Sequence, residues 1–72
     1  MTTLNNLLTG RSGRIRRLDG AADACNRLRE LGLAENSVVR LLQAGSPVLC
    51  QVQHARIGIS AELAVQVVVE PL

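Results

Sequence analysis

The clearest periodic pattern in the chain covers residues 21–31. Ala24, Leu28 and Leu31 recur at positions i, i+4 and i+7, which places them on one face of an α-helix. The polar residues between them then point outward. The spacing therefore predicts one helix with an apolar stripe, and its outward side chains include Arg27, Arg29 and Glu30.

Both ends of this helix carry sequence signals. Gly20 can serve as the N-cap, and Asp23 then lies close to the free N–H groups of the first turn. At the other end, Gly32 occupies a position that favours a left-handed residue, because glycine has no Cβ to clash at positive φ. Leu33 is predicted to fold back onto Leu28 in a Schellman ending.

Elsewhere the apolar pattern alternates, which is typical of half-buried strands. A bent first strand is predicted over residues 13–18, where Gly13 marks a bulge or a close backbone approach. Asn36 and Ser37 open the next strand, in which Val39 and Leu41 share one face. Residues 44–47, which end in Pro47, form a turn.

The second half of the chain continues in the same way. Residues 48–53 alternate as a strand, Ile57 and Ile59 direct a fourth strand into the core, and residues 65–70 form the last strand. Ser60 can cap one helical turn over residues 61–64. Residues 1–9 are a lead-in whose leucines Leu4, Leu7 and Leu8 pack on the core. We therefore expect a mainly β protein, a small β-barrel of about five strands with one inserted helix and one helical turn.

Size and composition set the stability of this barrel. The chain of 72 residues forms one domain, residues 1–72, and has no Phe, Tyr or Trp, so aliphatic side chains must build the core. A hydrophobic content of 47% favours a folded domain. A core this small contributes only about 3–5 kcal/mol. We therefore expect docking to a partner or to a second copy of the chain to matter.

The charge pattern argues against a nucleic-acid binder. All eight basic residues are arginines, and the net charge is only +2. One local cluster, formed by Arg11, Arg14, Arg16 and Arg17, is either a solvated face or a contact for phosphate or an acidic protein surface. Small barrels that bind nucleic acid generally add stacking aromatic residues, which this chain lacks.

Candidate chemistry is sparse. Cys25, Cys50 and His54 are the only soft or borderline metal ligands, and four residues of strand would hold Cys50 and His54 about 13 Å apart. We therefore expect Cys50 and His54 to be at most a weak metal site, and we expect no cofactor and no catalysis. Two thiols and no visible secretory signal or long apolar run favour a reduced, cytoplasmic protein without a membrane segment.

The order of these features resembles the ferrous iron transport protein A (FeoA) family over roughly residues 4–70. The resemblance lies in the bent strand, the helix ending at Leu31, Gly32 and Leu33, the Gly45-x-Pro47 turn, the Ile57-x-Ile59 strand and the terminal valine strand. It implies an SH3-like barrel and a non-catalytic accessory role in ferrous iron uptake. The implied partner is the cytosolic part of the GTPase-bearing transporter FeoB. The same barrel resembles the C-terminal module of metal-dependent repressors, so a metal- or effector-sensing module is the alternative.

Residue roles follow from the pattern and the resemblance together. The expected partner-binding surface is formed by outward side chains of the helix and the first strand, namely Arg14, Arg16, Arg17, Arg27, Arg29 and Glu30. The expected structural residues are Gly13, Leu28, Leu31, Gly32, Leu33 and Pro47. The family usually has Pro-Gly where this chain has Glu35 and Asn36, and Asn tolerates the left-handed conformation that such a turn requires.

Overall fold

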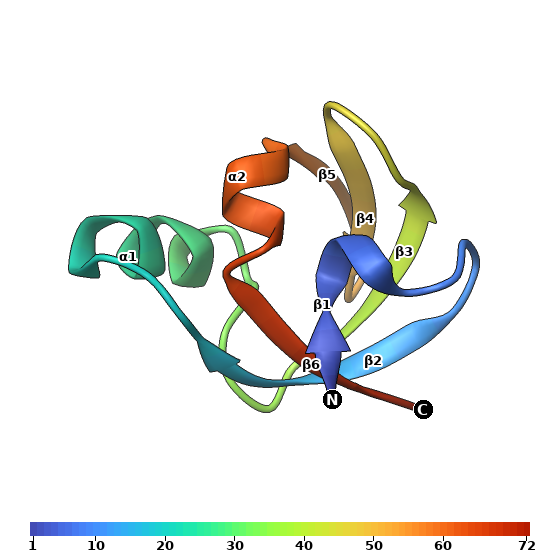
Figure 1. The fold of residues 1–72 in the computed structure, drawn as a ribbon, viewed down its shortest axis with the longest axis horizontal. Coiled ribbons are helices and arrows are strands. Elements are labelled where there is room, and N and C mark those ends of the chain that lie inside the picture. Colours follow the sequence, from blue (N-terminus) through green and yellow to red (C-terminus); the bar gives the residue numbers. More distant parts are fainter.

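The computed structural model describes residues 1–72 as one six-stranded antiparallel sheet that curls around an apolar interior (Figure 1). The strands are ordered β1-β6-β2-β3-β4-β5. The mainly β prediction is confirmed, with six strands instead of about five. The elements in chain order are β1 (Thr2–Thr3), the 3-10 turn η1 (Leu4–Asn6), β2 (Ser12–Leu18), α1 (Ala22–Glu30), β3 (Val38–Gln43), β4 (Val48–Val52), β5 (Ala55–Ile59), α2 (Ala61–Ala64) and β6 (Val67–Pro71).

The strand that the sequence did not predict is β1. Thr2 and Thr3 pair with Val69 and Val68 of β6, so the lead-in belongs to the sheet. Leu4 is completely buried, whereas Leu8 is 73% exposed. The expectation that Leu8 packs on the core is therefore wrong, because the chain has already left the core surface at the turn before β2.

The predicted bend in the first strand is confirmed. The register between β2 and β6 shifts between Ile15 and Arg17, as in a β-bulge. Gly13 provides the predicted close approach, since a Cβ at this position would lie 3.0 Å from Cβ of Val69. The absence of a side chain thus lets β2 and β6 cross tightly.

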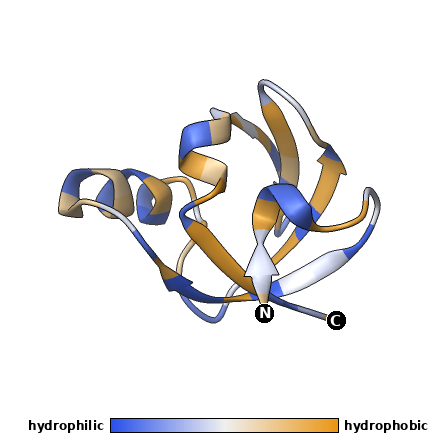
Figure 2. Ribbon diagram, viewed as in Figure 1, coloured by the Kyte–Doolittle hydropathy of each residue, from blue (hydrophilic) through white to orange (hydrophobic).

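Strand alternation fills the core as expected. Val39 and Leu41 of β3 are completely buried, and so are Val48 and Cys50 of β4. Figure 2 shows hydrophobic strand segments lining the interior. No polar or charged residue is buried. The core cluster comprises Leu4, Leu7, Ile15, Leu28, Leu33, Val39, Leu41, Val48, Cys50, Val52, Ile59, Ala64, Val67 and Val69.

Helix α1 ends as predicted. The N–H of Leu33 donates to the carbonyl of Leu28 at 2.9 Å, and the N–H of Gly32 donates to the carbonyl of Arg29 at 3.0 Å. With Gly32 at φ +94°, this is the Schellman ending. Leu28 and Leu33 are both fully buried.

Two details of α1 differ from the prediction. Its N-cap is Ala21, not Gly20, because the carbonyl of Ala21 accepts the first helical hydrogen bond, from the N–H of Cys25 at 3.0 Å. The predicted apolar stripe is also wrong at Leu31, which is 39% exposed. The helix stands at one end of the barrel, so only Cys25 and Leu28 are buried, and the chain reversal at Gly32 brings Leu33 inward.

Two connections follow their sequence signals, whereas the start of β6 does not. Ser60 caps α2, since its Oγ accepts the N–H of Leu63 at 3.2 Å. Val65 ends this helix, so β6 begins at Val67, later than predicted. Asn36 adopts φ +75°, the left-handed conformation expected for that turn. Neither helix has the length and apolar composition that a membrane crossing requires.

Candidate interaction surface

The arginines of β2 point outward, and each already has a partner within the chain. Nη1 of Arg14 donates to the carbonyl of Asn36 at 2.9 Å. Arg16 forms an ion pair with Glu70 of β6 through Nε and Nη2. Nε of Arg17 donates to the carboxylate of Asp19 at 2.9 and 3.1 Å.

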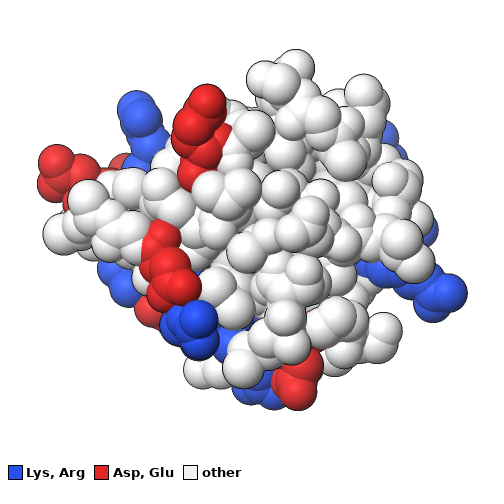
Figure 3. Space-filling model, viewed as in Figure 1, with Lys and Arg blue, Asp and Glu red and all other residues white.

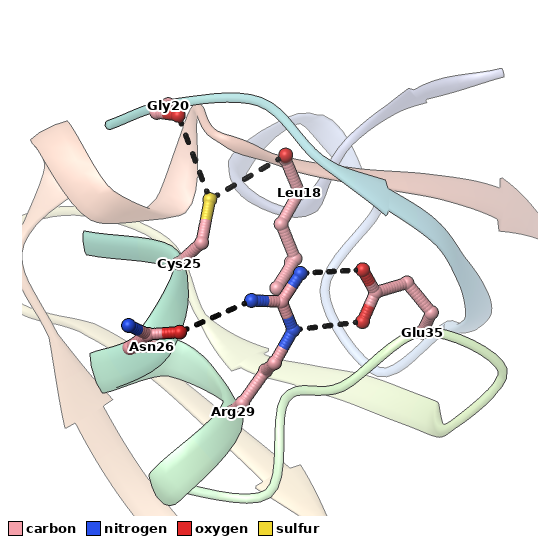
Figure 4. A network of polar contacts seen from close by, with 6 residues as sticks. All are labelled: Leu18, Gly20, Cys25, Asn26, Arg29 and Glu35. Carbon is pink, nitrogen blue, oxygen red and sulfur yellow. Dashed lines mark hydrogen bonds and ion pairs between the residues drawn. The ribbon is translucent and has the colours of Figure 1, made fainter. Parts of the chain in front are cut away.

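The polar side chains of α1 are divided between bound and free groups. Arg29 lies between Asn26 and Glu35, and its Nη2 lies 2.8 Å from Oε2 of Glu35 (Figure 4). Hydrogen bonds from Arg29 lower the pKa of Glu35 to about 2, and the same pairing raises the pKa of the guanidinium. Arg27 and Glu30 are exposed and make no side-chain hydrogen bond or ion pair.

Helix α1 is also tied to the end of β2 through a thiol. Sγ of Cys25 lies 3.5 Å from the carbonyl oxygen of Leu18 and 3.6 Å from that of Gly20 (Figure 4). No hydrogen bond or ion pair joins an arginine of β2 to a polar side chain of α1. The predicted contact surface therefore consists of two groups, one on β2 and one on α1, whose paired arginines have separate local partners.

The two weak candidates for a metal ligand lie in different environments. Cys50 is completely buried in β4, and burial raises the pKa of its thiol to about 11. His54 is exposed in the turn between β4 and β5. Metal ligation requires the thiolate, so the protonated, buried Cys50 is poorly suited to it. No group of three or more His, Cys, Asp or Glu side chains comes together, and both cysteines are free thiols.

Charged groups surround a neutral face of the molecule. Figure 3 shows Arg, Asp and Glu side chains around the rim, while the centre of this view is uncharged. The view looks onto η1 and β1, and Figure 1 shows both chain ends on this side. Contacts that depend on charge must therefore use the rim or another face.

Sequence reasoning left aside two arginines that the structure makes conspicuous. Arg40 of β3 and Arg56 of β5 are exposed and form no ion pair. Their outward positions could have been read from alternation with Val39 and Ile57. Their proximity across the sheet could not, because it depends on strand register.

The FeoA domain pattern matches residues 2–71. Among solved structures, the crystal structure of an iron uptake regulatory protein, FeoA, has a TM-score of 0.92 and 25% identity, covering 99% of this chain and 96% of that one. No curated protein matches the chain.

A second structure carries a closer sequence likeness. The FeoA of Stenotrophomonas maltophilia, solved with zinc, is 33% identical over 97% of this chain and 90% of that one, with a TM-score of 0.81. It is described as a procaryotic SH3 domain protein and a candidate ferrous iron transport activating factor. The expected SH3-like fold is thus confirmed.

The barrel also resembles part of larger regulators. A manganese-dependent transcriptional repressor matches with a TM-score of 0.88 at 16% identity, and the match covers 97% of this chain but only 41% of the repressor. At 16% identity, this match shows that the two proteins share a fold. The match over nearly the whole chain, together with the S. maltophilia relative, places this protein in the FeoA domain family.

Proposed function

We propose that this protein is a non-catalytic accessory domain for ferrous iron uptake that docks on the cytosolic, GTPase-containing region of FeoB. The observation that carries this proposal is the 33% identity, over almost the whole chain, with a relative described as a candidate ferrous iron transport activating factor. Family membership over residues 2–71 supports the same role. In this role the protein works in the cytoplasm and reaches the membrane only through its partner.

The mechanism is a shift of the partner's conformational equilibrium. A docked domain favours the conformation that it binds more tightly, and it needs no chemistry of its own. The proposed contact surface comprises Arg14, Arg16, Arg17, Arg27, Arg29 and Glu30. Arg27 and Glu30 are its groups without an intramolecular partner, so a partner's polar side chains can reach them without breaking an existing ion pair.

Binding of the purified chain to the purified cytosolic region of FeoB tests the proposal. We expect saturable binding by calorimetry, weakened by Arg27→Glu and by Arg17→Glu. Arg11→Glu is the matched control, because Arg11 is exposed, forms no ion pair and lies outside the proposed surface. Failure of the wild-type chain to bind would overturn the docking role.

A parallel measurement addresses the alternative of a metal-sensing module. Equilibrium dialysis with Fe(II) and with Zn(II) compares the wild-type chain with Cys50→Ala and His54→Ala. Under the accessory role we expect no tight binding that depends on these two side chains. Tight binding lost in both variants would favour a sensor instead.

A further inference from the structure

One row of polar side chains crosses the outer face of β2, β3, β4 and β5. The strand register places Ser12 opposite Arg40, Arg40 opposite Gln51, and Gln51 opposite Arg56. Directly opposite residues share a face of the sheet, with Cβ atoms about 4.5–5.5 Å apart. Two arginines therefore flank one glutamine on adjacent strands.

Part of this row lines an open groove of about 350 Å³. Apart from one valine, its lining side chains all have hydrogen-bond donors in a hydroxyl, an amide or a guanidinium group. Gln51 is half-buried there, and its amide approaches the backbone carbonyl of Gln53 at 3.4 Å. The lining residues are Ser12, Ser37, Val38, Arg40, Gln51 and Gln53.

No Asp or Glu lines the groove, so no carboxylate in its lining neutralises Arg40. The three ion pairs of the molecule involve Arg16, Arg17 and Arg29, all outside it. Nε of Arg40 donates to the carbonyl of Gly10 at 3.0 Å, which fixes the side chain and leaves its Nη atoms free. Arg56, beside Gln51, makes no side-chain hydrogen bond.

We propose that an acidic segment of another protein binds in this groove, with a carboxylate held by Arg40 and a second acidic side chain reaching Arg56. A planar guanidinium can bind a carboxylate through two parallel hydrogen bonds. The serine hydroxyls and glutamine amides of the groove can donate further hydrogen bonds to the same carboxylate. A groove this open on a sheet surface would leave a small molecule largely in water, whereas a protein segment covers it. The inference rests on the proposed function only in assuming that the chain acts by holding another protein.

Titration of the ¹⁵N-labelled chain with a hexaglutamate peptide tests this assignment by NMR. We expect amide shifts centred on Arg40, Gln51 and Gln53, and binding that weakens as NaCl is raised. Arg40→Glu and Arg56→Glu should each weaken binding about threefold to tenfold, as expected for loss of one exposed ion pair and gain of one repulsion. Arg56→Glu keeps the test independent of folding, since the Arg56 side chain is exposed and makes no hydrogen bond or ion pair within the chain.

A matched control separates a site from a general charge effect. Arg11→Glu changes the net charge by the same amount, lies outside the groove lining and should retain the wild-type affinity for hexaglutamate. An equal loss in this variant, or shifts spread over β2 and α1, would overturn the groove assignment. Tighter binding of inorganic phosphate or of an oligouridylate would also overturn it, and so would dimerisation through this face in sedimentation.

The outcome is distinguishable from that of the FeoB experiment. Binding of hexaglutamate in the groove by a chain that ignores FeoB would overturn the proposed function alone. Binding of FeoB by a chain that ignores hexaglutamate would overturn only the groove assignment.

Discussion

Gly32 and Gln53 both have a positive φ, but only Gln53 carries a side chain. Gly32 has φ +94° and lets α1 reverse into the core, whereas Gln53 has φ +55° in the turn between β4 and β5. A left-handed conformation costs a residue with a Cβ roughly 1–2 kcal/mol. Positive φ is therefore relaxed at Gly32 and strained at Gln53.

Replacement of Gly32 should lower the free energy of unfolding. Gly32→Ala adds a Cβ at positive φ, 3.4 Å from Cγ1 of Val52, and should cost about 1–2 kcal/mol in urea denaturation. Gly32→Asn should cost less, because Asn tolerates the left-handed region. Equal costs for the two variants would mean that the new contact with Val52, and not the positive φ, causes the loss of stability.

The turn at Gln53 predicts the opposite sign. Gln53→Gly relieves the strain at positive φ and should raise the free energy of unfolding by up to about 1 kcal/mol, after the greater freedom of glycine in the unfolded chain is subtracted. His54→Gly is the matched control, since His54 has no positive φ and glycine there should only destabilise. Thermal unfolding of both variants measures the difference.

Among elements, α1 depends on a connection that lies outside the sheet. The pair of Arg29 and Glu35 joins the last turn of the helix to the loop before β3 (Figure 4). The Schellman turn lies between these two residues, so the pair and the turn hold the same reversal of the chain. Both partners are partly exposed, so salt should weaken the pair.

Acid should loosen this connection in a defined pH range. The pKa of Glu35 is about 2 in the folded chain, below its ordinary value of 4.5, so the pair stabilises the fold fully above pH 4.5 and loses that effect as pH falls toward 2. Glu35→Gln should therefore reduce the dependence of the unfolding midpoint on pH between about 5 and 2. Glu62→Gln, at a residue without an ion pair, is the control, and an unchanged pH dependence in Glu35→Gln would contradict the assignment.

Elements with a local sequence signal could be predicted, and those set by register could not. The end of α1 and the cap at Ser60 depend on residues close in sequence, and alternation in β4 identifies its buried face. Strand β1 has only Thr2 and Thr3 and no apolar pattern. Its position depends on pairing with β6, which comes from the other end of the chain. The partner of Arg16 is Glu70, which is 54 residues away, and the row of Arg40 and Arg56 also depends on register.

In the molecule as a whole, the N-terminal segment is part of the aliphatic core. Leu4 is completely buried and Leu7 is 7% exposed. The segment before β2 therefore contributes side chains to the core that the strands enclose. A domain this small has a free energy of unfolding of only about 3–5 kcal/mol. Loss of one such leucine is therefore comparable to the whole stability.

Shortening the side chain of Leu4 to alanine should unfold most of the protein molecules. Leu4→Ala removes a fully buried side chain and should cost about 2–5 kcal/mol, which circular dichroism at 25 °C would detect as loss of β-structure. Leu8→Ala, at a position 73% exposed, should change the free energy of unfolding by less than about 0.5 kcal/mol. A folded Leu4→Ala variant with near-normal stability would show that the N-terminal segment is dispensable.

The pairing of β1 with β6 brings the two ends of the sequence to one edge of the barrel. Because entry and exit are neighbours, a short bridge could join them and the chain could be cut open at an exposed loop, such as the one around Gly45, with the same barrel retained. For the same reason, the fold could be inserted into a loop of a host protein with little distortion of the host backbone.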